Sequence, residues 1–406
     1  MEHSKKSGGG IVVSIVFRQA LASLADNFSA PYIGYYLASL TTSGVLQGLL
    51  QFSTNSLPTA VQILLGPLID WWRKYVAVLL VTSIVASLLW IAISLTTIPE
   101  FFVSLVTLRA IAVGLSGLAF TALLGVLFST SMRGRVLSLV NVVSQLVALA
   151  VFILTAFVLV PDVSLLRYLF LFSGFVSLVA SSIWFKLLYL DRDIASGRSF
   201  SERPPNPFRG MAEVASDKSF MKFNLAYSGY IAVMSIAWPW FPVAQKYVFR
   251  MSIVDLAAMN ILSTLSTMAS QYFMMKHLHR LSVKWLIVAS RAGFIVPPLF
   301  YSIAPGPELV YVSSVLTGPF TAIGNVIIPL YTLNKSRKSM YASYLSLLNF
   351  SQGIAAAAGS MAGGFTMDYL VSSAGGDYGA LRVGFIGVAF LRAAMTIPFI
   401  KIDDVE

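Results

Sequence analysis

The segment from Tyr75 to Thr97 reads YVAVLLVTSIVASLLWIAISLTT and contains no charged residue. It follows the basic pair Arg73-Lys74 and precedes a turn with Pro99. A helix needs about 20 consecutive, mostly apolar residues to cross the hydrocarbon core of a bilayer. The segment therefore predicts one membrane-spanning helix whose ends are set by the polar residues on either side.

Similar apolar segments fill most of the chain, separated by turns that contain Pro, Gly and charged residues. The longest polar stretch lies near the middle and divides the segments six and six. We therefore expect an N-terminal six-helix bundle over 1–189, a cytoplasmic linker over 190–219 and a C-terminal six-helix bundle over 220–406. The twelve predicted spans are 11–37, 44–69, 75–97, 101–126, 136–160, 166–189, 220–245, 253–275, 284–303, 308–333, 341–371 and 381–400.

The composition excludes an ordinary soluble domain and a disordered chain. Hydrophobic residues make up 57% of the sequence and charged residues 11%, whereas soluble domains contain about 25% charged residues. In a soluble chain, the net charge of +11 would favour a nucleic acid partner. With the N-terminus in the cytoplasm, however, 20 of the 28 basic residues fall in cytoplasmic segments and 4 in external ones. Basic residues concentrate in cytoplasmic loops, so we expect no nucleic acid partner, cytoplasmic termini and a location in the cell (plasma) membrane.

The two predicted halves share a short sequence pattern. The fifth span contains Ser-Leu-Val-Asn over 138–141 and the eleventh contains Ser-Leu-Leu-Asn over 346–349, each followed by Ser and Gln at a similar spacing. Chance resemblance between short apolar strings is the alternative explanation. Two parallel halves of six helices are a transporter architecture, with the binding site between the repeats near the midplane.

The stretch from Gly66 to Lys74 reads GPLIDWWRK. It resembles the signature loop between helices two and three of the major facilitator superfamily: a Gly, an apolar pair, an Asp and a basic pair. The resemblance implies a fold of two pseudo-symmetric six-helix bundles and a secondary transporter that works by alternating access. It also implies a gate formed by Gly66, Asp70, Arg73 and Lys74. Trp72 stands where the family pattern usually has a Gly.

A second part of the chain resembles the same family. The turn Arg133-Gly134-Arg135 is similar to a basic turn common after the fourth helix, and it adds Arg133 and Arg135 to the expected gate. The Gly-Pro motif that the family's antiporters carry in helix five is missing from 136–160. Its absence weakens the case for a drug antiporter.

Asp26 is the only acidic residue deep inside a predicted span. It lies roughly 22 Å along the first span, and Arg109 lies roughly 12 Å down the fourth span from the opposite side. In a core of about 30 Å the two depths nearly agree. Helices one and four line the central cavity in the family that the chain resembles. We therefore expect Asp26 and Arg109 to pair and to couple transport to protons; a permanent structural ion pair is the alternative.

Other charges inside the predicted spans have a structural interpretation. Arg18 lies near the inner end of the first span, where its long side chain either reaches the lipid headgroups or faces the inner cavity. Arg291 and Arg392 lie on helices nine and twelve, which are peripheral in this family. We expect both of them to support packing.

Polar and aromatic residues in the spans are candidates for the substrate cavity. Polar residues also bond neighbouring membrane helices to one another, and aromatic residues also form interfacial belts. The candidates are Asn27, Tyr32, Tyr35, Asn141, Gln145, Trp238, Trp240, Asn325, Asn349 and Gln352.

An enzyme is the rival class, but the sequence does not favour one. The three His residues lie outside the spans, the closest acidic pair is Asp191 and Asp193, and there is no Cys. We expect no catalytic residue, no metal and no cofactor. The predicted function is secondary active transport of a small organic solute, coupled to protons through Asp26, by a monomer in a lipid bilayer. The alternatives are an uncoupled facilitator, a lipid or amphiphile flippase, and a drug-efflux carrier.

Overall fold

A computed structural model describes residues 2–128, 130–158, 163–196, 207–277, 282–336 and 341–403. Within these ranges the chain is helical and contains no strand. The helices up to the central linker are α1 (Glu2–Ser29), η1 (Ala30–Tyr32), α2 (Ile33–Leu40), α3 (Gly44–Asn55), α4 (Leu57–Trp72), α5 (Tyr75–Leu95), α6 (Pro99–Leu127), α7 (Thr130–Val158), α8 (Leu165–Leu187) and α9 (Tyr189–Ser196).

The second part of the chain is also helical, and its first element begins at the end of the linker. Its elements are α10 (Pro207–Val214), α11 (Lys218–Ile236), α12 (Trp240–Val243), the π-helical turn η2 (Ala244–Val248), α13 (Ile253–His277), α14 (Val283–Gly293), α15 (Val296–Ile303), α16 (Pro307–Lys335), α17 (Tyr341–Ser373), η4 (Tyr378–Ala380), α18 (Leu381–Thr396) and η5 (Ile397–Lys401).

Nine segments in the described part of the chain are long and apolar enough to cross a membrane. The three remaining predicted spans correspond to α3 with α4, α11 with α12, and α17. The first two are broken into shorter helices, and α17 is rich in Gly, Ser and Ala, which lowers its hydropathy. The all-helical membrane fold is therefore confirmed, and the count of twelve stays a prediction for these three segments.

Proline accounts for the helix breaks, because it lacks a backbone N–H and clashes with the preceding turn. Pro58 follows the break between α3 and α4, and Pro239 lies between α11 and α12. Two consecutive prolines, Pro297 and Pro298, follow the break between α14 and α15. The breaks free backbone carbonyls, which then need other partners.

Arg392 supplies two of those partners. Its guanidinium donates to the carbonyl of Phe294 at 2.7 Å and to that of Met234 at 2.6 Å. Phe294 follows the last residue of α14, and Met234 lies in the last turn of α11. The side chain is buried, with 1% exposed. This arrangement agrees with the packing role predicted for Arg392.

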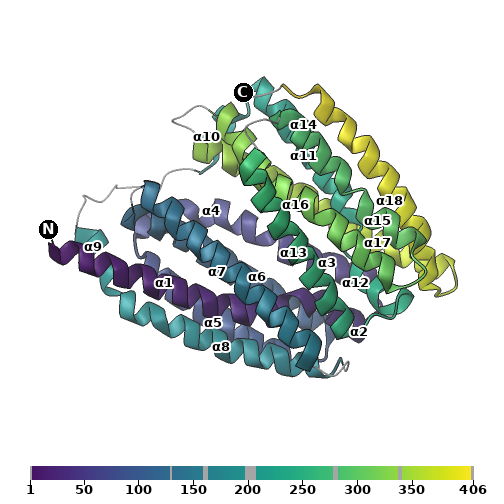
Figure 1. Cartoon of the computed structure of the whole chain (residues 1–406), viewed down its shortest axis with the longest axis horizontal. Helices are drawn as coiled ribbons and strands as arrows, with labels where there is room; N and C mark the ends of the chain where they lie inside the picture. The colour runs from purple at the N-terminus through teal and green to yellow at the C-terminus, as the bar shows by residue number, and fades with distance from the viewer. Residues whose placement is uncertain are drawn as a thin grey trace. The chain divides into compact units, whose positions relative to one another are not determined.

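Contacts divide the chain into two compact units. Unit 1 comprises residues 1–33 and 57–207, and unit 2 comprises residues 34–56 and 208–406. In unit 1, α5 packs against α6 and α8, and α1 packs against α7 and α8 (Figure 1). In unit 2, α17 packs against α3 and α11, while α16 packs against α13 and α14. Each unit has its own buried apolar core.

This division differs from the predicted one in one segment. Residues 34–56, expected in the N-terminal bundle, group with unit 2. Gly44 and Gly48 of α3 allow this: a Cβ on either would lie within 2.6 Å of a backbone oxygen of Gly364 or Ser360 on α17. Without side chains at these two positions the helices approach closely, as small residues permit between membrane helices.

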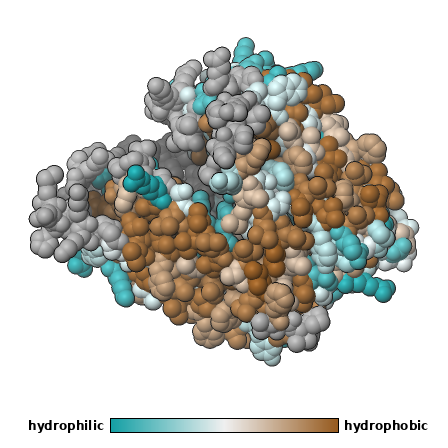
Figure 2. Space-filling model, in the orientation of Figure 1, coloured by the Kyte–Doolittle hydropathy of each residue, from teal (hydrophilic) through white to brown (hydrophobic). Residues whose placement is uncertain are grey.

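The outer surface of the helices is apolar. Phe157 on α7 is 85% exposed and Phe390 on α18 is 73% exposed. Figure 2 shows hydrophobic side chains covering much of the visible helical surface, with hydrophilic ones gathered toward the helix ends. Such exposure is unfavourable in water and favourable in lipid, so the surface agrees with the predicted membrane environment.

The chain after α8 is anchored at the start of α5. The Asp191 carboxylate accepts hydrogen bonds from the amides of Val76 at 2.9 Å and Ala77 at 2.8 Å. These amides belong to the first turn of a helix and have no partner within it. Burial raises the pKa of the Asp191 carboxyl, and the two hydrogen bonds oppose that shift.

Candidate functional site

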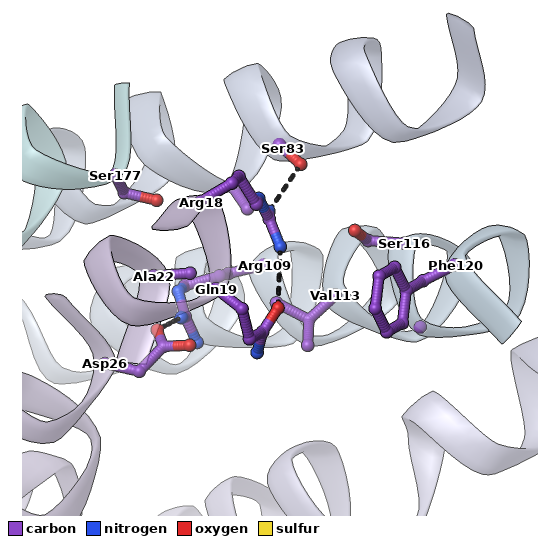
Figure 3. A pocket seen from close by; sticks show the side chains of 12 residues that line it. Arg18, Gln19, Ala22, Asp26, Ser83, Arg109, Val113, Ser116, Phe120 and Ser177 are labelled. Carbon is purple, nitrogen blue, oxygen red and sulfur yellow. Dashed lines mark hydrogen bonds and ion pairs between the residues drawn. The ribbon is translucent and has the colours of Figure 1, made fainter. Parts of the chain in front are cut away.

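Unit 1 contains a cavity of about 180 Å³ with both polar and apolar walls. Four helices contribute to it: α1, α5, α6 and α8 (Figure 3). The lining residues are Arg18, Gln19, Ala22, Asp26, Ser83, Ala86, Arg109, Val113, Ser116, Gly117, Phe120 and Ser177. Its charged lining residues are therefore two arginines and one aspartate.

Asp26 on α1 and Arg109 on α6 form a hydrogen-bonded ion pair in this cavity. The predicted pairing of these two residues is therefore confirmed. The Arg109 side chain is 12% exposed, whereas the Asp26 side chain is 47% exposed. The carboxylate is thus the accessible member of the pair, and the guanidinium is the buried one.

Aromatic rings hold Arg109 in place. Its guanidinium carbon lies 4.0 Å from the centroid of the Trp90 ring on α5. Trp90 in turn stacks on Phe170 of α8, with ring centroids 5.5 Å apart and an interplanar angle of 14°. A cation over an aromatic face is stabilised electrostatically, and more so when water is excluded. These contacts hold the Arg109 guanidinium in one position. Asp26 is therefore the member of the pair that is free to change its contacts.

Arg18 lines the same cavity, about two turns before Asp26 on α1. Its guanidinium donates to the Ser83 hydroxyl at 3.0 Å and to the Gln19 side-chain oxygen at 3.2 Å (Figure 3). Its Cζ lies 5.2 Å from the centroid of the Trp184 ring. Of the two predicted alternatives, the structure shows the one in which Arg18 faces the cavity.

Residues 15–360 match the family profile described as Major Facilitator Superfamily. The chain belongs to the major facilitator superfamily. Because this family consists of transporters, the chain is a multi-pass membrane transporter and not an enzyme. The match spans most of both predicted bundles, so the resemblance seen in the gate motif extends well beyond it.

Solved structures of three transporters share the superfamily fold. A mutant of the nucleoside transporter NupG superposes with a TM-score of 0.76 at 13% identity, covering 96% of this chain and 99% of its own. A bacterial homolog of the human lysosomal transporter Spinster gives 0.67 at 12% identity, covering 96% of each chain. A mutant of the E. coli fucose:proton symporter FucP gives 0.55 at 14% identity, covering 97% and 98%. No curated protein sequence matches the chain significantly.

The first-helix candidates of this superfamily member are not among the residues that line the cavity of unit 1. Asn27 donates within its own helix to the carbonyl of Ser23 at 2.7 Å. Tyr32 is fully buried. Tyr35 belongs to unit 2, where its hydroxyl donates to the carbonyl of Met251 at 2.6 Å. The described contacts of Asn27 and Tyr35 are therefore those of packing residues.

The later candidates differ in exposure. Asn141 and Asn325 are exposed, whereas Gln145, Asn349 and Gln352 are half-buried. None of the five lines the cavity of unit 1. Their predicted substrate contacts stay predictions.

The two tryptophans of the seventh predicted span differ from each other. Trp238 is half-buried and packs against the core of unit 2. Trp240 is 1% exposed, and its indole N–H donates to the carbonyl of Gly363 on α17 at 2.7 Å. Trp240 therefore lies inside a helix contact, away from both a lipid interface and a cavity surface.

The structure describes the side chains of only some of the predicted gate residues. Gly66 and Asp70 lie on α4, but their side chains are outside the described part of the structure. Arg73 adopts a left-handed backbone with φ of 53°, which turns the chain from α4 into α5. Lys74 occupies the N-cap position of α5, but its exposed side chain makes no capping hydrogen bond.

The basic turn that precedes the fifth predicted span lies within helix α7. Its Arg133 donates to the carbonyl of Gly125 at 2.8 Å, across the junction of α6 and α7, and Arg135 is exposed. The gating role of these residues stays a prediction.

Sequence reasoning missed the hydroxyl groups of the cavity and one carboxylate. Ser83, Ser116 and Ser177 line the cavity, and nothing distinguishes them in sequence from other serines in the spans. Asp368 lies near the C-terminal end of α17 and accepts from the amides of Gly44 at 2.5 Å and Val45 at 3.2 Å. The position of Asp368 near the end of a predicted span can be read from the sequence, but the amides that it binds cannot.

No group of three or more His, Asp or Glu residues suited to a metal ion occurs within the described ranges. The cavity has arginine, serine and one carboxylate, and positive charge opposes binding of a cation.

Proposed function

We propose that the chain is a secondary transporter that moves a small organic solute across the cell membrane by alternating access, coupled to protons through Asp26. The observation that carries the proposal is the Asp26–Arg109 pair, whose carboxylate is 47% exposed in a cavity of a superfamily transporter. A charged pair inside a span is unfavourable in free energy, so its presence indicates a functional role. Transport is such a role. The basic-residue bias supports cytoplasmic termini.

Protonation of Asp26 changes the charge of the cavity by one unit. When the carboxylate is ionised, it neutralises Arg109 through their hydrogen bond. When it is protonated, Arg109 loses that partner and its charge becomes available to a solute or to another helix. A carrier that changes conformation only in selected combinations of proton and solute occupancy couples the two fluxes.

The comparisons support a solute of modest size. The similar structures include transporters described for nucleosides, for a peptide conjugate and for fucose with a proton. An uncoupled facilitator and an amphiphile carrier share the fold, and they remain the alternatives because fold alone does not determine coupling. We expect the protein to work as a monomer.

Uptake into proteoliposomes tests this proposal. Vesicles with the purified protein receive a defined mixture of small carboxylates, sugars, nucleosides and amines, with and without a proton gradient, and retained solutes are identified by mass spectrometry. We expect at least one solute to accumulate against its gradient only when a proton gradient is present. Equal, purely downhill uptake in both conditions would show an uncoupled facilitator instead.

The helix breaks provide hinges for such a transporter. The chain leaves unit 1 after Ile33 and returns to it at Leu57. The first crossing follows the 3-10 turn η1, and the second lies at the break between α3 and α4. Hinges are a few residues at element ends that absorb a change in backbone angles. We propose that residues 34–56 bend relative to the rest of the first two spans at these points.

The Asp368 carboxylate latches α3 to α17, and its replacement tests that role. Ser360 is fully buried on α17, and a Cβ on Gly48 would contact its backbone oxygen at 2.6 Å. Because the chain has no Cys, Ser360→Cys introduces a single thiol that reacts only when α3 and α17 separate. Replacement of a capping residue by Ala costs about 0.5–2 kcal/mol, so Asp368→Ala should raise the labelling rate roughly 2- to 30-fold.

A matched thiol in unit 1 provides the control. Ser87 on α5 is also fully buried, and the labelling rate of Ser87→Cys should not change with Asp368→Ala. An unchanged rate at position 360 would contradict the latch, and a rise at both positions would indicate general loosening.

A further inference from the structure

Arg18 forms no salt bridge in the described part of the chain; Asp26 attracts its charge from a distance, but that carboxylate is hydrogen-bonded to Arg109. Ion pairs in the described residues include Arg109 with Asp26 and Lys335 with Asp403. The hydrogen-bond partners of Arg18, Ser83 and Gln19, are uncharged. Its Nε is buried and makes no hydrogen bond in the described structure.

The side chain of Arg18 points into the helix bundle and away from lipid. Ser83, which accepts from its guanidinium, is 4% exposed, and Trp184, over which it lies, is fully buried. A snorkelling arginine extends its head group toward the membrane interface instead. Headgroup binding therefore does not account for the position of this charge.

The cavity consequently carries an excess of one positive charge over its described lining. Arg18 and Arg109 contribute two, and Asp26 contributes one of opposite sign. The lining residues from α5 and α8, which are Ser83, Ala86 and Ser177, carry no charge. A charge inside a span is unfavourable unless it is compensated. Arg18 and Arg109 share one carboxylate, so an anionic ligand beside Arg18 would complete the compensation.

We propose, on the basis of the proposed transport function, that the solute is a small organic monoanion whose carboxylate binds to the guanidinium of Arg18. A guanidinium binds a carboxylate through two parallel hydrogen bonds. The Ser83 hydroxyl lies next to it as a further donor. Farther along α6, Val113 and Phe120 form an apolar wall for the body of the solute (Figure 3).

This assignment also gives the direction of coupling. Protonation of Asp26 removes the one negative charge of the described cavity lining and leaves Arg109 without its ion pair. The potential in the cavity then becomes more positive, so the anion binds more tightly. Linkage is reciprocal, so anion binding favours proton uptake by Asp26. The proton and the anion therefore bind together and move in the same direction.

Ligand-induced stabilisation of the purified protein tests the assignment. The probes are three carboxylates and their neutral amides: benzoate with benzamide, lactate with lactamide, and nicotinate with nicotinamide. A ligand that binds the folded state raises the melting temperature, and a titration gives its Kd. We expect a carboxylate to bind at least tenfold more tightly than its amide.

Arg18→Gln is the decisive variant. Loss of a hydrogen bond to a charged group should weaken carboxylate binding about 10- to 100-fold. Arg18→Lys keeps the charge without the planar fork and should show an intermediate loss. Arg192→Gln, which removes an exposed arginine on α9, is the matched control and should bind like the wild type.

The remaining outcomes are decisive in other ways. Equal binding of amides and carboxylates, no shift with any of the carboxylates, or unchanged binding by Arg18→Gln would each overturn the proposal. An equal shift with sodium chloride would show an adventitious ion only and would overturn it too. Gradient-driven uptake of a neutral solute would contradict the proposal that the solute is an anion, but it would agree with proton-coupled transport. Tight carboxylate binding without gradient-driven uptake would reject coupled transport and support the anion site.

Discussion

Asp26→Asn is expected to abolish accumulation of the solute against its gradient while leaving downhill flux. Asn is isosteric with Asp but does not ionise in the working pH range, so the proton has no site at this position. A gradient of one pH unit stores about 1.4 kcal/mol, which supports about tenfold accumulation with one proton per solute. The variant should bring this ratio to about one.

The measurement is the steady-state accumulation ratio in proteoliposomes, with the membrane potential clamped at zero and the external pH varied. Exchange of labelled for unlabelled solute at equal concentrations reports whether the carrier still cycles. Asp377→Asn, which alters an exposed carboxylate in the turn before α18, is the control and should accumulate like the wild type. If Asp26→Asn keeps tenfold accumulation with the same pH dependence, the ion pair is structural and the proton binds elsewhere.

Gly363→Ala is expected to destabilise the protein strongly. A Cβ at this position on α17 would lie 2.0 Å from the carbonyl oxygen of Ile236 on α11. The clash is with backbone, which cannot rotate away, and the neighbouring hydrogen bond from Trp240 to the Gly363 carbonyl would be strained as well. Overpacking of this kind costs roughly 1–3 kcal/mol. We expect a lower apparent melting temperature and a smaller monodisperse fraction after purification.

A Gly→Ala substitution at another position on α17 should not destabilise the protein. A Cβ on Gly353 would meet only the Ser56 carbonyl oxygen at 3.6 Å, an ordinary contact. Alanine is better than glycine inside a helix by about 0.5–1 kcal/mol, so Gly353→Ala should be neutral or stabilising. Intrinsic fluorescence during thermal unfolding compares the two variants. Similar melting temperatures for both would show that α17 does not need this close approach.

The Asp26–Arg109 pair was predictable because the two signals are local. Each residue is a charge inside an apolar segment, and the distance to the segment end gives its depth at 1.5 Å per residue. The family resemblance placed helices one and four around one cavity. Depth and helix identity were sufficient for this pair, whose charges attract.

The same reasoning did not predict where the Arg18 side chain points, because that direction depends on the rotation of α1 about its axis. The sequence allowed a side chain directed to the headgroups or to the cavity. Packing of α1 against α7 and α8 selects the second, with Ser83 and Trp184 as its neighbours. The polar candidates Asn141 and Asn325 show the same limit, since both are exposed in the structure.

The sequence alone determined the class of the protein and predicts its course through the membrane, because the length of an apolar segment and the placement of basic residues are properties of the chain itself. Tertiary structure decided which side chains meet. It placed residues 34–56 with unit 2, joined Asp368 to the first amides of α3, and put a second arginine into the Asp26 cavity. These contacts depend on helix rotation and on approach distances set by residues such as Gly44 and Gly363, which no pattern along the chain encodes.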